Sequence, residues 1–156
     1  MAVLSWGKPA IYIKKDGESA FTKLPDAVEG TVTLATTKGS KTEAKVEGGE
    51  NEDVRYQKNT YVLNVTIRVA KGRKAPIEDN DGIIDGNFEL YLQPEDPACV
   101  GFYMPKSTCS VEDSWSSADG GQWAYAFDAL KPATGNQVQW GVVTVSEGTP
   151  SIAPVA

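Results

Sequence analysis

Apolar and polar residues alternate with a period of two along most of the chain, and clusters of Gly, Pro, Asn and Asp separate the alternating runs. This pattern is typical of strands that bury one face. No segment keeps a 3.6-residue period over three turns, although a short helix is predicted at 94–103 or within 20–28. The predicted fold is therefore all-β, an antiparallel β-sandwich or barrel with at most one short helix. The predicted strands cover residues 10–14, 30–37, 41–47, 60–69, 86–93, 107–115, 121–130 and 136–145.

The alternation also assigns side chains to faces in three of these strands. In the run 60–69, the residues expected to face the core are Tyr61, Leu63, Val65, Ile67 and Val69, and those expected to face water are Thr60, Val62, Asn64, Thr66 and Arg68. By the same rule Val32 and Leu34 oppose Thr31 and Thr33, and Ala44 and Val46 oppose Glu43, Lys45 and Glu47. The three strands are predicted to form one sheet, with an apolar face and a solvated face.

A charged, Gly-rich excursion occupies residues 48–58, "GGENEDVRYQK". Its single Val offers too little apolar surface to pack against the rest of the domain. Two interpretations stay open: a solvated hairpin tip, or an arm that becomes ordered against a partner. The final residues, 146–156, are rich in Pro, Ser and Ala and are predicted to be a loose extension of a single domain over residues 1–145.

Composition and charge narrow the classes of function. The chain has 156 residues, 40% of them hydrophobic, and a net charge of −6. The excess lies in the C-terminal part, since residues 87–156 contain eight acidic and two basic residues. An acidic chain without a basic patch is poorly suited to tight nucleic-acid binding. Without a long apolar run or a signal-like apolar region near the start, we expect a protein that neither spans a membrane nor is secreted.

Catalytic and metal-binding patterns are weak. The chain has no His, which removes the usual general base, the Ser-His-Asp triad and most zinc sites. The acidic stretch 78–86, "EDNDGIIDG", does not place ligands at the positions of an EF-hand loop, so it is interpreted as a turn. The Gly pair in 117–123 lacks the Lys of a phosphate-binding loop. Neither catalytic residues nor a metal or cofactor is therefore predicted, and the chain is not expected to be an enzyme.

The two Cys residues and four Trp residues have structural interpretations. Cys99 and Cys109 are expected to be reduced thiols. The four Trp residues are favoured as core or interface anchors, with a sugar-stacking platform as the alternative. They are Trp6, Trp115, Trp123 and Trp140.

Three segments together resemble the tail tube (major tail) proteins of long-tailed bacteriophages. They are the opening "MAVLSWGKPAIYI", the Glu-Gly-Gly-Glu excursion followed by "NTYVLNVTIRV", and "LYLQPEDPACVGFYMPKSTCSVEDSWSSADGGQWAYAFDALKP". The resemblance covers most of residues 1–145 and is closest to forms from phages and prophages of gut Bacteroides-like hosts. The resemblance lies in the order of these segments and in their residue patterns, and it includes no catalytic signature.

The resemblance implies a structural virion protein, assembled in the host cytoplasm, whose rings, with six copies as the family expectation, stack into a tube for DNA ejection. Other tail proteins, such as the tape measure, tail terminator and baseplate or tip, would be its partners, and DNA would pass without specific binding. The residues expected to face the lumen are Glu43, Lys45, Glu47, Asn64, Thr66 and Arg68. The expected inter-ring arm comprises Gly48, Gly49, Glu50, Asn51, Glu52, Asp53, Arg55, Tyr56 and Lys58. Family lumens are usually acidic, whereas this set mixes Glu43 and Glu47 with Lys45 and Arg68.

Two other classes of function stay open. A carbohydrate-binding or adhesion β-sandwich module would use the Trp side chains for stacking. A hydrolase on a β scaffold would need a pair of carboxylates, and no pair is singled out by the sequence.

Overall fold

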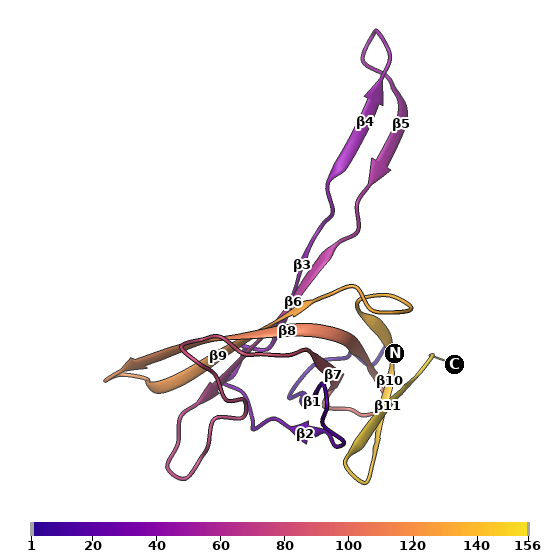
Figure 1. The fold of residues 1–156 in the computed structure, drawn as a ribbon. Coiled ribbons are helices and arrows are strands. Elements are labelled where there is room, and N and C mark those ends of the chain that lie inside the picture. The colour runs from indigo at the N-terminus through magenta and orange to yellow at the C-terminus, as the bar shows by residue number, and fades with distance from the viewer. Residues whose placement is uncertain (1, 156) are drawn as a thin grey trace.

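The computed structural model describes residues 2–155, and these residues form antiparallel strands with no helix. Figure 1 shows a curved sheet from which one long hairpin projects. The fold is all-β, as predicted. The strands are β1 (Ala10–Lys15), β2 (Thr22–Lys23), β3 (Thr33–Thr37), β4 (Lys41–Lys45), β5 (Asn51–Tyr56), β6 (Thr60–Arg68), β7 (Phe88–Gln93), β8 (Val100–Ser116), β9 (Gly120–Ala129), β10 (Gln139–Ser146) and β11 (Thr149–Ala153).

The main sheet has the order β2-β1-β7-β8-β9-β6-β3, and the hairpin β10-β11 joins it through β8. The long strand β8 links two parts of this sheet. Its first half pairs with β7 and β10, and its second half pairs with β9. Phe88 of β7 and Phe127 of β9 meet edge to face on the core side of β8, and the buried residues of both parts belong to one cluster. The strands therefore enclose one core.

Alternation along the strands generates this core. Leu63, Val65 and Ile67 of β6 are all buried, which confirms their predicted orientation. The prediction for Val69 is wrong, because β6 ends at Arg68 and the Val69 side chain is exposed. The other buried apolar residues are Ile11, Ile13, Leu24, Ile77, Ile84, Phe88, Leu90, Phe102, Met104, Cys109, Val111, Tyr125, Phe127, Val138 and Val143.

Both predicted helices are absent from the structure. Residues 94–99 form a turn in which Asp96 accepts hydrogen bonds at its side chain from the Ala98 amide and at its carbonyl from the Cys99 amide. Such local Asp bonding competes with a helix, and β8 begins at Val100. Within 20–28, Thr22–Lys23 pair with β1 instead.

The C-terminal segment is also more regular than predicted. Thr149–Ala153 form β11, which pairs with β10 across a two-residue loop at Glu147 and Gly148. Both loop residues have positive φ, as a tight hairpin turn of this kind requires.

Candidate functional site

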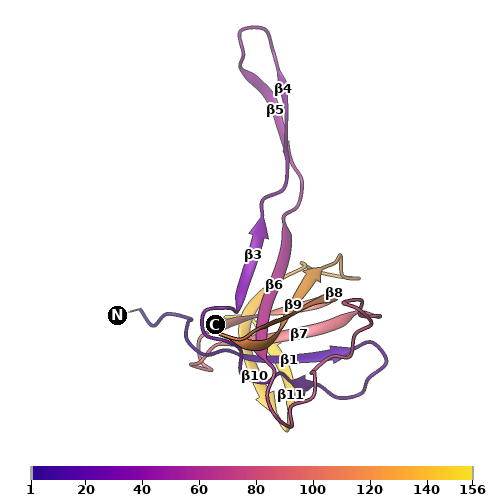
Figure 2. The same ribbon diagram turned by 90° about the vertical axis from the view of Figure 1, so that its left-hand side faces the viewer.

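The most prominent feature is an arm, the β4-β5 hairpin with its turn, residues 41–56 (Figures 1 and 2). Within residues 2–155 its strands pair only with each other, in a separate two-stranded sheet. The prediction that 41–47 would join 30–37 and 60–69 in one sheet is therefore wrong. The predicted faces of this strand are also wrong, because Ala44 and Val46 are exposed like the polar residues between them. The partner of Lys41–Lys45 is β5, which includes part of the predicted excursion.

The Gly pair explains how the arm turns back. Gly48 and Gly49 have φ values of 95° and 89°, which residues with a Cβ rarely adopt. The amide of Val46 donates to the carbonyl of Glu50 and the amide of Gly49 donates to the carbonyl of Val46, at 2.9 and 3.1 Å. The turn between the strands is thus held by backbone hydrogen bonds.

The arm exposes almost all of its side chains. Val54 is partly buried, and every other residue from 41 to 56 is exposed. Glu43 lies 2.6 Å from Lys41 and 3.4 Å from Lys45, and the Lys41 hydrogen bond is the main reason that the pKa of Glu43 is lowered. These exposed ion pairs contribute little to stability. Hydrogen bonds of the backbone, rather than packing, therefore hold the arm in shape.

The base of the arm is anchored more tightly. The Gly39 amide donates to the side-chain oxygen of Asn59, and the Gln57 amide donates to the Ser40 carbonyl. A Cβ at Gly39 would overlap the Gln57 carbonyl oxygen, so the two chains cross too closely for a side chain there. The arm therefore leaves the body at a defined point, at the ends of β3 and β6.

The structure separates the residues predicted to face a lumen into two groups. Asn64, Thr66 and Arg68 lie on β6, on the face opposite its buried residues. Glu43 and Lys45 lie in β4, and Glu47 lies in the turn of the arm. The residues predicted for the inter-ring arm lie in the turn of the arm, in β5 and just after it, with Lys58 at its base.

Asn64, Thr66 and Arg68 belong to a wider surface, which we call the polar face. Strand register places Asn64 beside Thr33, Ala126 and Ser110, on the same side of β3, β6, β9 and β8. None of its residues is buried, and most are small. It comprises Thr33, Ala35, Val62, Asn64, Thr66, Arg68, Thr108, Ser110, Glu112, Ser114, Gln122, Ala124, Ala126 and Asp128. Sequence reasoning correctly placed Thr33 on the same solvated face as the β6 residues, but it missed the residues of β8 and β9, because the pairing that gathers them is not local.

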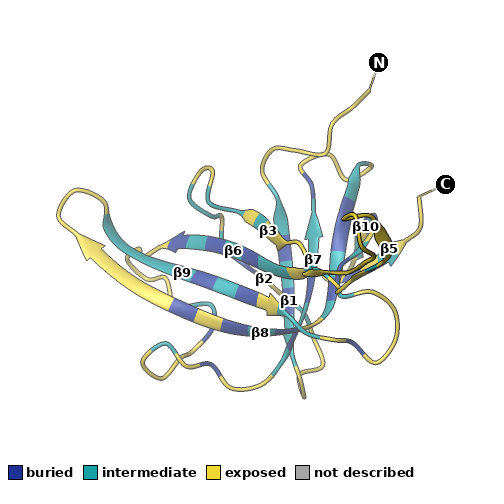
Figure 3. Ribbon diagram, turned by 90° about the horizontal axis from the view of Figure 1, so that it is seen from above, coloured by how far each residue is buried: buried dark blue, intermediate teal, exposed yellow. Residues whose placement is uncertain are grey.

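The strands under the polar face end in two free edges. Strand β3 pairs only with β6, and within residues 2–155 the segment Glu112–Ser116 of β8 pairs only with β9. Figure 3 shows this end of the β8-β9 hairpin extending past the core with exposed residues. Unpaired edges of this kind can accept a strand from another chain.

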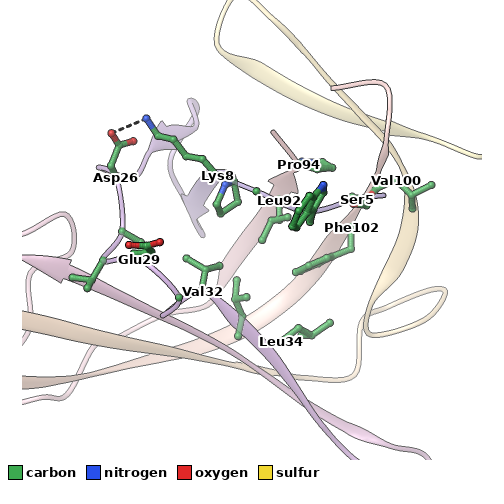
Figure 4. Close-up of a pocket in the computed structure, with 18 of the residues that line it drawn as sticks. Ser5, Lys8, Asp26, Glu29, Val32, Leu34, Leu92, Pro94, Val100 and Phe102 are labelled. Atoms are coloured by element: carbon green, nitrogen blue, oxygen red, sulfur yellow. Dashed lines mark hydrogen bonds and ion pairs between the residues drawn. The ribbon is translucent and has the colours of Figure 1, made fainter. Parts of the chain in front are cut away.

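An apolar pocket of about 740 Å³ opens next to the β3 edge (Figure 4). Val32, Leu34 and Leu63 form one wall, and Leu92, Phe102, Trp6 and Trp140 are among the other lining residues. Its rim carries Glu29 and the ion pair Lys8–Asp26, with a separation of 2.9 Å. Of the four Trp residues, Trp6, Trp115 and Trp140 are largely exposed, and Trp123 is half-buried against the core.

Reactive groups are scarce in the part of the chain that the structure describes. No cluster of Cys, Asp and Glu suited to a metal ion occurs within residues 2–155. Both Cys residues are free, and burial raises the pKa of the Cys109 thiol to about 12, so it is not nucleophilic at neutral pH. In the stretch 78–86, Asp79 accepts a hydrogen bond from the Gly82 amide, consistent with the predicted turn. No helix among the described residues is long and apolar enough to cross a membrane.

Comparison with protein families finds no family model that matches the chain, and comparison with characterised proteins finds no relative. The features that bear on function are therefore those of the structure itself: the arm, the polar face, the free edges and the pocket.

Proposed function

We propose that the chain is a structural subunit that assembles into rings and stacked tubes, as the tail tube protein of a long-tailed phage. The observation that carries this proposal is the four-stranded section β3-β6-β9-β8, which has a free edge at each side, along β3 and along Glu112–Ser116 of β8. These four strands are antiparallel throughout, so β8 of one copy runs antiparallel to β3 of the next when copies follow one another around a ring. Repeating the section extends one antiparallel sheet from copy to copy.

Closure of such a sheet gives a hollow cylinder. The polar face would then line the bore, since the opposite face of the same strands is filled by the subunit core. Small Ser, Thr, Ala and Asn side chains would leave the bore wide and wetted. Its charged residues are Arg68, Glu112 and Asp128, one basic and two acidic. A surface of this kind gives phosphates few cations to bind, as passage of DNA requires.

The arm supports stacking of rings. It projects from the body at the end of β3 and the start of β6 (Figure 2), and every side chain of the arm except that of Val54 is exposed. In a tube it would contact the adjacent ring, where its exposed ion pairs and Tyr56 would gain partners.

Sedimentation velocity of the purified chain over a wide range of concentration, salt and temperature tests the proposal. We expect discrete ring species and larger assemblies as concentration rises. A species that remains monomeric under every condition, including mixtures with other tail proteins, would count against it.

A second candidate function is carbohydrate binding. The observation that favours it is the pocket, where exposed Trp6 and Trp140 lie with the carboxylates of Asp26 and Glu29. Aromatic faces and carboxylates are suited to stacking on sugars and bonding their hydroxyls. A glycan array separates the two functions, because a tube subunit should bind no sugar.

A further inference from the structure

The end of the β8-β9 hairpin carries an exposed apolar patch formed by Trp115, Gly121 and Val69. Trp115 lies opposite Gly121 in the strand register, and its side chain is 77% exposed. A Cβ built on Gly121 would lie 2.9 Å from Val69 and 3.5 Å from the Trp115 ring, so the three residues are contiguous. Val69 is also exposed. A contiguous apolar patch at a projecting tip is typical of an interaction site.

Trp115 lies on the side of the sheet that faces the core. Val111, four residues earlier in β8, is buried and pairs with buried Tyr125. Because residues two apart in a strand share a face, Val111, Asp113 and Trp115 point to the same side. Trp115 therefore continues the core-facing side of the sheet beyond the end of the subunit core.

The apolar pocket offers a surface that fits an indole, but the Trp115 side chain of the same copy cannot reach this pocket. Its wall includes Leu63 of β6, whereas Trp115 lies next to Val69, six residues further along the chain. At about 3.4 Å per residue this separation is about 20 Å. Trp6 and Trp140 of the same chain line the pocket, and the Trp115 indole can enter it only from another molecule.

We propose that Trp115 of one copy docks into the apolar pocket of a second copy, beside the β3 edge. The proposal rests on the proposed assembly and names one contact within it. Core-facing residues are odd-numbered in this part of β8 and even-numbered in β3, where Leu34 pairs with buried Leu63. Suppose that the free edge of β8 in one copy pairs with β3 of the next copy, and that the core-facing sides of both strands stay on the same side of the joined sheet. Trp115 then lies opposite an even-numbered residue of β3. Val32 and Leu34, which line the pocket, are such residues.

The charges of the two edges favour this partner. Residues 111–122 contain three acidic residues, Glu112, Asp113 and Asp119, and no basic residue. On the β3 side, Lys38 directly follows the strand, while Lys41 is paired with Glu43 in the arm. The acidic residues of the β8-β9 end disfavour β8 beside β8, and Lys38 favours β8 beside β3. A second copy thus supplies an apolar surface for Trp115 and a basic residue for the acidic end of the β8-β9 hairpin.

The test compares Trp115→Ala with Ser114→Ala, which changes the neighbouring residue on the polar face. We expect both variants to have the melting temperature of the wild type, because Trp115 is exposed. Trp115→Ala should raise the concentration needed for assembly at least about tenfold, as the loss of an aromatic anchor does at other interfaces. Ser114→Ala should assemble like the wild type. Sedimentation velocity and negative-stain microscopy measure the outcome.

A cross-linking experiment locates the contact. Trp115→Cys mixed with Leu34→Cys should give a disulfide-linked dimer on mild oxidation, whereas Ser114→Cys mixed with Leu34→Cys should not. Each single variant alone controls for Cys99 and Cys109. If the wild type assembles, Trp115→Ala assembles at the same concentration and no specific cross-link forms, the docking is wrong and the proposed function stands. If the wild type never assembles, both are wrong.

Discussion

Leu63 and Asn64 are neighbours in β6 whose side chains lie on opposite faces of the sheet. Leu63 has no exposed surface, and Asn64 lies on the polar face between Thr33 and Ala126. Leu63→Asp should prevent folding, because an unpaired buried carboxylate costs several kcal/mol of a total stability of about 5–15 kcal/mol. Asn64→Asp should fold, because water solvates the new charge. Circular dichroism and thermal unfolding of both variants compare the two effects.

Substitutions at Asn64 also test whether the polar face lines the bore. Asn64→Lys, repeated around a ring, would place a belt of positive charge where DNA passes. We expect normal folding and tube formation, with DNA ejection that slows at low salt and recovers at high salt. Asn64→Asp is the matched control, with no slowing. Ejection that is equally fast for Asn64→Lys and wild type at low salt would argue against a bore lined by the polar face.

The body should fold without the arm. Replacement of residues 42–55 by Asn-Gly retains the anchors at Gly39, Ser40, Gln57 and Asn59, so the body should keep its stability. Rings should form without stacking into tubes, and electron microscopy distinguishes the two. Tubes of normal length from this variant would contradict the inter-ring role of the arm.

Hydrogen exchange gives a second test of the arm. Residues 48–58 should exchange quickly in free subunits, since the two-stranded arm has exposed hydrogen bonds and almost no packing, and slowly after assembly. The buried strand β6 serves as an internal control that is protected in both states. Equal protection of the arm in free and assembled protein would refute its ordering on a neighbour.

Strand β6 could be predicted from sequence because its side chains alternate strictly and its buried face decides its orientation. Alternation does not determine strand partners: the prediction that 30–37 and 60–69 share a sheet is confirmed by the pairing of β3 with β6, whereas the sheet predicted for β4 is wrong. Strand β5, Asn51–Tyr56, has four charged or amide residues and little alternation, and it is a strand because the turn at the Gly pair lets it pair with β4. The polar face, free edges and pocket depend on pairing between distant segments, which no local pattern encodes.

Alkaline pH should destabilise the subunit. Burial raises the pKa of Cys109 from 9.0 to about 12 and that of Tyr125 from 10.0 to about 12. The folded state therefore holds these protons at pH values where the unfolded chain releases them, so stability is complete below about pH 9 and falls as pH rises toward 12. Urea unfolding at pH 7 to 11 measures this slope. Cys109→Ala should reduce it, and a stability independent of pH in this range would contradict the burial of both groups.

Electron microscopy of wild-type protein at high concentration tests the assembly of this chain most directly. Tubes or rings with a central channel are expected, and a reconstruction should place Asn64 and Thr66 on the channel wall, with β8 of each copy beside β3 of the next. Particles that stay single, or rings in which the polar face lies on the outside, would contradict the proposed function.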